Sequence, residues 1–297
     1  MVLKKVWNFI KKKIRSILII LVGVAIFSYP YISNYVEEKG HTEIITEYTE
    51  VVATLDEETI TEELEKAQIY NENLSGDPVH DPFIEGSGYT VPENYENVLN
   101  IYGNGVMAYI EIPEIDCYLP IYHGTDSETL EKGVGHIAQS SLPIGGTSTH
   151  AILTGHTGLP SSELFTKISK LEVGDVFYIH VLNQTLKYEI YETEVIEPED
   201  ISKLTIEKGK DLVTLVTCTP YGVNTHRLLV KGERTADDEE AVEEIETEDA
   251  ETNLYKYVII IACVIVLAIF IVIVIVLVII IRKRRKATLK WLIKIIK

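Results

Sequence analysis

A cysteine at the end of a strand-like run and an arginine shortly after it are the residues of this chain best suited to covalent chemistry. Cys218 closes the run Thr214-Leu215-Val216-Thr217-Cys218, and Arg227 follows nine residues later, at the start of another such run. A thiol becomes a good nucleophile when it ionises, and nearby positive charge favours the thiolate. An arginine keeps its charge and can hold a carbonyl or an oxyanion. The pattern indicates cysteine catalysis; a buried structural cysteine with a surface arginine is the alternative.

A cysteine nucleophile usually works with a histidine, and His156 has the most suitable surroundings of the eight histidines. It follows the short apolar run 151–154, and Gly155 and Gly158 flank it. Strand ends that open into loops are where rigid scaffolds present catalytic groups. His226 is a rival because it neighbours Arg227. Adjacent residues on a strand point to opposite faces, so His226 is expected to face away from the site.

Short β runs separated by turns must position these residues. They are expected at 106–112, 117–121, 151–154, 176–181, 185–195, 212–217 and 227–232, with brief helices near 127–132 and 161–168. This spacing predicts a mainly β fold, a closed or nearly closed antiparallel barrel. The sequence has no P-loop, dinucleotide fingerprint or zinc spacing, so neither a cofactor nor a metal is expected.

The segment before the barrel has a different character. Apolar residues recur at helical spacing over 43–73, which predicts one or two amphipathic helices that pack on the domain. Residues 74–92 are rich in Gly, Ser, Pro and Asp and indicate an irregular loop.

Two apolar runs are predicted to anchor the chain in a membrane. Val258 to Ile281 is an unbroken run of 24 residues, long enough as a helix to cross a hydrocarbon core of about 30 Å. The run near 17–32 contains Pro30 and is interpreted as an uncleaved anchor, with a signal peptide as the alternative. Basic residues flank both runs on their outer sides, which places both termini in the cytoplasm. We therefore expect a multi-pass protein of the cell membrane with its catalytic domain on the extracellular face.

The net charge limits the kinds of partner that the protein can bind, and the cysteine content limits its possible disulfides. The formal net charge of -18 argues against nucleic acid. The acidic stretch 237–251 is typical of a solvated linker. Of the three cysteines, Cys263 lies in the second apolar run. A disulfide between Cys117 and Cys218 is an alternative, but the strand pattern around Cys117 favours simple packing.

The chain is accordingly divided into seven segments. They are a basic cytoplasmic N-terminus (1–16), an N-terminal transmembrane signal anchor (17–35), a helical extension with an irregular loop (36–105), the β-barrel catalytic domain (106–235), an acidic linker (236–256), a C-terminal transmembrane helix (257–281) and a basic cytoplasmic tail (282–297).

Several separated motifs resemble those of the sortase family. The string Thr214 to Gly222 with Arg227 resembles the sortase active-site signature, and Thr154 to Pro160 resembles the histidine segment. The run Gly133 to Gly146 is similar as well. The resemblance covers roughly 106–232.

Sortases are cysteine transpeptidases of Gram-positive surfaces with an eight-stranded β-barrel. The resemblance implies that Cys218 attacks the Thr–Gly bond of a Leu-Pro-x-Thr-Gly-like sorting signal and forms a thioacyl intermediate. It implies His156 as the acid/base and Arg227 as the clamp for substrate and oxyanion. It also implies Leu215 and Thr217 as substrate-binding residues. An amine, rather than water, resolves the intermediate.

The triplet Asp81-Pro82-Phe83 resembles the lid motif of class C, the pilin-polymerising sortases. In that class a loop before the barrel covers the site, with its Asp near the Arg and its aromatic over the Cys. An ordinary turn is the alternative for the triplet. Asp77-Pro78 is a second Asp-Pro pair in this loop but lacks the aromatic.

The leading hypothesis is an enzyme that transfers one pilin to a lysine amine of the next pilin and so assembles pili. Its partners would be pilins and surface proteins that carry a sorting signal, together with the cell membrane. A housekeeping sortase that anchors proteins to peptidoglycan is an alternative within the family. A non-enzymatic tethered surface scaffold is an alternative of another class. A papain-like protease is disfavoured because the cysteine ends a strand. The sequence does not indicate an oligomeric state.

Overall fold

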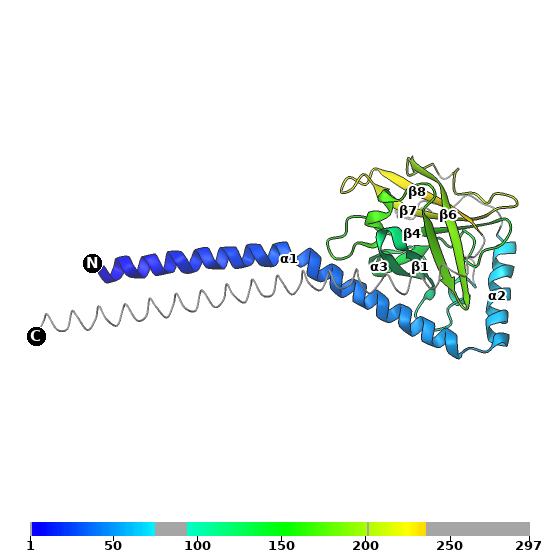
Figure 1. Ribbon diagram of the computed structural model, residues 1–297, viewed down its shortest axis with the longest axis horizontal. Helices are drawn as coiled ribbons and strands as arrows, with labels where there is room; N and C mark the ends of the chain where they lie inside the picture. Colours follow the sequence, from blue (N-terminus) through cyan, green and yellow to red (C-terminus); the bar gives the residue numbers. More distant parts are fainter. Residues whose placement is uncertain (1, 75–93, 201, 236–297) are drawn as a thin grey trace, which may run out of the picture. The chain divides into compact units, whose positions relative to one another are not determined.

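Eight β-strands form a closed barrel in the computed structural model, which describes residues 2–74, 94–200 and 202–235 (Figure 1). The strands are β1 (Val106–Ile112), β2 (Cys117–His123), β3 (Val134–His136), β4 (Thr149–Thr154), β5 (Val176–Val181), β6 (Gln184–Ile196), β7 (Asp211–Thr219) and β8 (His226–Arg234). The prediction of an eight-stranded, mainly β barrel is confirmed. The described residues belong to one compact unit, Met1–Asp237; a second unit, Asp238–Lys297, lies outside them.

The order of strands around the barrel is β1-β2-β3-β4-β7-β8-β6-β5. β2 pairs with β3, and β4 with β7, in parallel, while the other neighbours are antiparallel. The expectation of an antiparallel barrel was therefore wrong at two seams. A parallel pair needs a crossover between its strands. Residues 155–210, which include β5 and β6, form that crossover between β4 and β7.

Two apolar clusters cover the opposite faces of β7, because successive side chains on a strand alternate. Leu215 belongs to the main cluster inside the barrel, together with Val230 of β8. Val216 belongs to a second, smaller cluster. Its other members are Ile137, Ile152, Ile196, Leu204 and Leu229. Because β7 is packed on both faces, it forms a rigid base for any site built on it.

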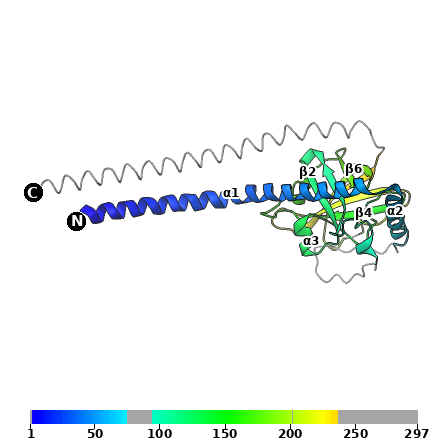
Figure 2. The same cartoon turned by 90° about the horizontal axis from the view of Figure 1, so that it is seen from below.

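Two helices precede the barrel and pack against it (Figures 1 and 2). They are α1 (Val2–Thr54) and α2 (Glu57–Glu72). The carboxylate of Asp56 caps α2 by accepting the backbone N–H of Thr59 at 2.9 Å. The hydroxyl of Tyr48 on α1 donates to the Met107 carbonyl at 3.1 Å and accepts the Leu182 N–H at 2.9 Å. The expected helices over 43–73 thus form, although the first continues an N-terminal helix.

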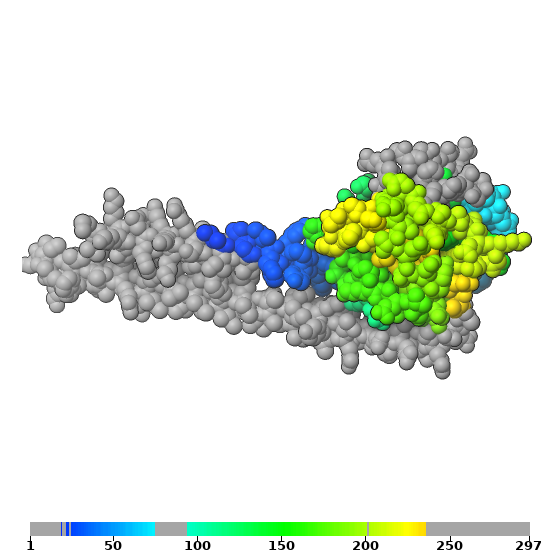
Figure 3. All heavy atoms as spheres, turned by 90° about the horizontal axis from the view of Figure 1, so that it is seen from above, coloured from blue at the N-terminus to red at the C-terminus, as the bar shows by residue number. Residues whose placement is uncertain are grey.

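Four short helices complete the described fold. They are η1 (Tyr95–Asn97), η2 (Pro113–Ile115), α3 (Ser127–Lys132) and η3 (Leu164–Lys170). The carboxylate of Asp126 caps α3 through the N–H groups of Glu128 and Thr129. The part of the chain from β5 to β8, drawn in green to yellow, forms much of the surface seen in Figure 3.

Within the residues that the structure describes, no helix combines the length and the apolar character needed to cross a membrane. The predicted C-terminal span, the acidic linker beyond residue 235 and the basic tail lie outside the described residues.

Candidate active site

Cys218 and Arg227 are direct partners across the β7–β8 pair. Directly opposed residues on neighbouring strands place their Cβ atoms about 4.5–5.5 Å apart on the same face. Cys218 is half-buried, and Arg227 is only 7% exposed. Thr219 is the partner of His226, so His226 lies on the alternate face, as expected. The hairpin therefore presents a thiol and a buried cation side by side.

The parallel pairing of β4 with β7 brings His156 to the same end of the barrel. Thr154 is the partner of Val216, and the N–H of Gly155 donates to the Val216 carbonyl at 3.1 Å. His156 follows Thr154 by two residues, as Cys218 follows Val216. Two parallel strands in this register carry their next residues forward together. The three residues predicted to be catalytic are thus assembled by three neighbouring strands.

Thr217 joins the cysteine strand to the histidine loop. Its hydroxyl donates to the Gly155 carbonyl at 2.6 Å, and its side chain is 2% exposed. Leu215 is fully buried in the barrel core. Both residues alternate with Cys218 and point away from its face of the strand. They support the site from beneath, and direct contact of either residue with substrate stays a prediction.

Arg227 is oriented by the backbone of its own turn. Its Nη1 donates to the carbonyl of His226 at 3.1 Å and to that of Asn224 at 3.3 Å. Asn224 has a φ of 60°, in the left-handed region that Asn tolerates better than most residues. The turn between β7 and β8 therefore contributes to the direction of the guanidinium.

Burial lowers the pKa of His156, and the negative charge of Glu131 opposes that effect. Loss of hydration disfavours the imidazolium, while a carboxylate stabilises it. His156 is consequently mostly neutral at pH 7. A neutral imidazole can take a proton from a thiol and return it to a leaving amine.

The loop after His156 is closely packed. A Cβ on Gly155 would lie 2.8 Å from the ring of Phe165, so only glycine fits there without a shift. A Cβ on Gly158, which has a φ of +77°, would lie 3.1 Å from the ring of Tyr221. The loop that carries His156 and the loop that follows Cys218 therefore touch.

The remaining predictions concern Cys117, the lid residues and a metal site. No disulfide joins Cys117 and Cys218 in the described structure, and Cys117 is buried, as expected for a packing residue. The lid residues Asp81, Pro82 and Phe83 lie outside the described residues. Within residues 2–74, 94–200 and 202–235, no cluster of three or more His, Cys, Asp or Glu side chains could hold a metal ion.

Four supporting residues escaped the sequence reasoning. Glu131, Asn224, Phe165 and Tyr221 act on the site through charge, backbone direction or packing. They lie in loops or short helices whose position depends on the whole fold. The glycines at 155 and 158 were the signal that a side chain from elsewhere packs there.

Comparisons with known proteins agree with this arrangement. The family described as "Sortase domain" matches residues 110–235. The crystal structure of sortase C-1 from Actinomyces oris is 51% identical, with a TM-score of 0.58, and the match covers 61% of this chain and 99% of that one. The chain belongs to the sortase family of cysteine transpeptidases.

Other relatives of this sortase point the same way. The crystal structure of sortase C-1 from Streptococcus pneumoniae is 44% identical, with a TM-score of 0.62, and the match covers 66% of this chain and 100% of that one. Sortase D of Bacillus subtilis (strain 168) is 34% identical over 128 residues, 42% of this chain and 62% of the relative. The solved neighbours are class C enzymes, which confirms the class that the sequence motifs indicated.

Proposed function

We propose that this sortase joins pilin subunits. It would cleave a Leu-Pro-x-Thr-Gly-like sorting signal between Thr and Gly and transfer the acyl group to a lysine amine of another pilin. The observation that carries the proposal is the assembly of Cys218, Arg227 and the His156 loop on three adjacent strands. The similarity to sortase C of Streptococcus pneumoniae, whose crystal structure is described as giving insight into pilin substrate specificity, supports pilins as the substrates.

The chemistry follows from the three side chains. The thiolate of Cys218 attacks the threonine carbonyl carbon, and Arg227 stabilises the negative charge that develops on its oxygen. The C–N bond breaks while His156 as imidazolium gives its proton to the leaving glycine amine. The lysine amine then attacks the thioester carbonyl, His156 takes a proton from that amine, and Cys218 leaves as thiolate. An isopeptide bond results without any net redox change.

Access to the thiol is part of the proposal. Asp81 would pair with Arg227, and Phe83 would cover Cys218, until the loop opens. The sequence resemblance to the class C lid motif supports this step. We also propose that residues 17–35 and 257–281 anchor the chain in the membrane, with the barrel outside. The apolar runs and their basic flanks support that placement.

Mass spectrometry after incubation with sorting-signal peptides tests the function. We expect a thioacyl adduct on Cys218 whose mass identifies cleavage after Thr, and no adduct on Cys218→Ala. With the lid triplet changed to alanine, continued absence of an adduct would contradict the proposal. Assays with purified pilins and with peptidoglycan precursors then separate pilus assembly from anchoring. The scaffold alternative requires the surface phenotype to survive Cys218→Ala.

A further inference from the structure

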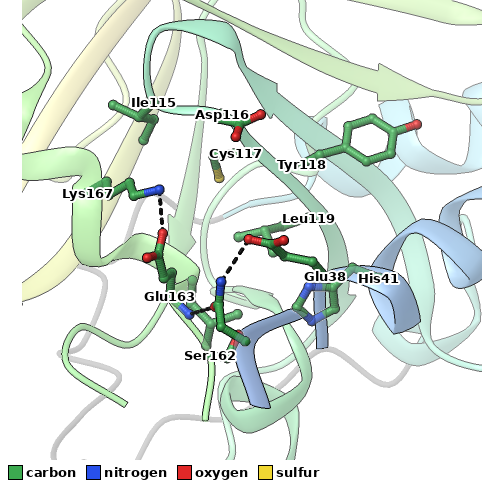
Figure 4. Close-up of a pocket in the computed structure, with 12 residues that line it drawn as sticks. Glu38, His41, Ile115, Asp116, Cys117, Tyr118, Leu119, Ser162, Glu163 and Lys167 are labelled. Atoms are coloured by element: carbon green, nitrogen blue, oxygen red, sulfur yellow. Dashed lines mark hydrogen bonds and ion pairs between the residues drawn. The ribbon is translucent and has the colours of Figure 1, made fainter. Parts of the chain in front are cut away.

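Helix α1 is hydrogen-bonded to the segment that begins η3, at a junction formed by Asn34, Glu38, Glu163 and Lys167. Glu38, Glu163 and Lys167 are labelled in Figure 4. The side-chain oxygen of Asn34 accepts the backbone N–H of Glu163 at 2.8 Å, and its Nδ2 donates to the carboxylate of Glu38 at 2.8 Å. A carboxylate only accepts hydrogen bonds, so the amide nitrogen must face Glu38. The amide oxygen is thereby directed at Glu163. Glu163 in turn pairs with Lys167 of η3.

The start of η3 holds the His156 loop. The N–H of Phe165, two residues after Glu163, donates to the His156 carbonyl at 3.1 Å. The hydroxyl of Thr166 accepts the Gly158 N–H at 3.0 Å. The ring of Phe165 also packs directly behind Gly155. The backbone on both sides of His156 therefore depends on where the first turn of η3 lies.

Helix α1 is a firm support for that turn. His41, Ile45 and Tyr48 are 3%, 1% and 2% exposed, and Tyr48 bonds to the barrel through both its donor and its acceptor. Asn34 lies two helical turns before His41 on the same helix. The position of Asn34 relative to the barrel is thus fixed by the burial of residues further along α1.

We propose that Asn34 is a positioning residue for His156, acting through Glu163 and the first turn of η3. The proposal rests on the acid/base role of His156 given above. Proton transfer to the leaving amine demands hydrogen-bond distance in the transition state. A displaced imidazole would slow the chemical steps while leaving the binding of the sorting signal largely intact.

Cys117 offers a readout of the junction that does not depend on activity. It lines a cavity of about 30 Å³ together with Asn34, His41 and Glu163. Its side chain is 8% exposed, and burial raises the pKa of its thiol to about 12. A thiol in that environment reacts slowly. Separation of η3 from α1 would uncover it.

The test compares three full-length variants in detergent. Asn34→Leu removes both hydrogen bonds at similar size. The double variant Asn34→Asp, Glu38→Gln keeps an acceptor for the Glu163 N–H and replaces the Asn34–Glu38 bond by one in which the amide at position 38 donates. Gln68→Leu is the matched control, because Gln68 makes the same kind of amide–carboxylate bond to Glu72, at 2.9 Å, on the exposed face of α2. Transpeptidation kinetics with sorting-signal peptide and an amine acceptor give kcat and KM.

Asn34→Leu is expected to lower kcat by about 5-fold, since loss of one hydrogen bond is of that order, with KM within about twofold. The double variant Asn34→Asp, Glu38→Gln should recover most of kcat, and Gln68→Leu should match wild type. In a Cys218→Ala, Cys263→Ala background, Asn34→Leu should also speed the labelling of Cys117 by a thiol reagent. Unchanged kcat and unchanged labelling in Asn34→Leu would overturn the proposal, as would a double variant no better than Asn34→Leu. Inactive wild type would instead contradict the proposed function, and the Cys117 labelling would still decide whether Asn34 holds the junction.

Discussion

The hydroxyl of Thr217 donates to the carbonyl of Gly155 at 2.6 Å, and this bond ties the residue before Cys218 to the residue before His156. This buried hydrogen bond therefore links the chain next to the nucleophile to the chain next to the acid/base. In this way the barrel fixes their separation without using either functional group.

Loss of the Thr217 hydroxyl should therefore impair catalysis. Thr217→Val keeps the shape but leaves the Gly155 carbonyl without its donor, at a cost of about 1–3 kcal/mol. We expect kcat to fall by about 5- to 150-fold if that cost falls on the transition state, and Thr217→Ser to restore most of it. Steady-state transpeptidation kinetics provide the measurement. Thr214→Val, which removes a buried hydroxyl bonded to His150 at 2.7 Å, is the control. An equal loss of kcat in that control would show that the effect is general destabilisation.

The charge of Glu131 should raise the pKa of His156. Burial lowers that pKa and Glu131 opposes the lowering, so Glu131→Gln should move it further down. Less imidazolium is then available at pH 7, and kcat should fall by about twofold, the size expected of one partly screened charge. NMR titration of His156 in a Cys218→Ala background measures the shift directly. Glu128→Gln, on the same helix and bonded to Lys132, is the control. A His156 titration identical in wild type and Glu131→Gln would contradict this prediction.

The lid prediction is testable by thiol labelling. Asp81→Ala and Phe83→Ala should each speed the reaction of Cys218 with a small thiol reagent, because the proposed cover is loosened. Asp77→Ala, in the second Asp-Pro pair of the same loop, should label like wild type. Peptide mass mapping separates Cys218 from Cys117, which is buried. Equal labelling rates in all four proteins would leave no support for a lid at this triplet.

Stability should depend on pH through His136. This histidine is fully buried; its Nε2 lies 2.8 Å from the Ser141 carbonyl, and burial lowers its pKa to about 3. Below pH 6.5 the unfolded chain takes up a proton that the folded protein refuses. The free energy of unfolding should then decrease by about 1.4 kcal/mol per pH unit from this residue as pH falls from 6.5 towards 3.

Chemical denaturation at several pH values between 7.5 and 4.5 measures that slope. His136→Gln should lower stability and make the slope shallower by one proton. Ile137→Val removes a buried methyl group nearby but no titrating group, so it should lower stability equally at every pH. A slope in His136→Gln as steep as in wild type would assign the pH dependence to other groups.

The strand pattern made most of the barrel predictable, but its closure was harder to foresee. The runs that became β1 and β5 have the expected bounds, because each is a mostly apolar run between turn residues. β3 is three residues long and gave no recognisable period. The parallel β4–β7 seam depends on a long crossover, which no local pattern encodes.

The site was predictable where the type and spacing of single residues indicate their chemistry. Cys218 and Arg227 were found from their spacing, and their direct pairing across β7 and β8 explains why that spacing occurs. Contact of Thr217 with substrate stays a prediction, and the structure adds that its hydroxyl donates to the Gly155 carbonyl. Partners such as Asn34 and Glu163 are 129 residues apart in the chain, so only the folded structure brings them together.

Closure of the barrel also restricts how the enzyme can hold an extended peptide. Each described strand of the barrel has a neighbour on both sides, so none of these strands leaves its whole edge open to strand addition. Under the proposed function, the sorting signal would be held by side chains and loops around Cys218. Release of the product would then break no β-ladder, and the barrel would not take up a strand of its protein substrates.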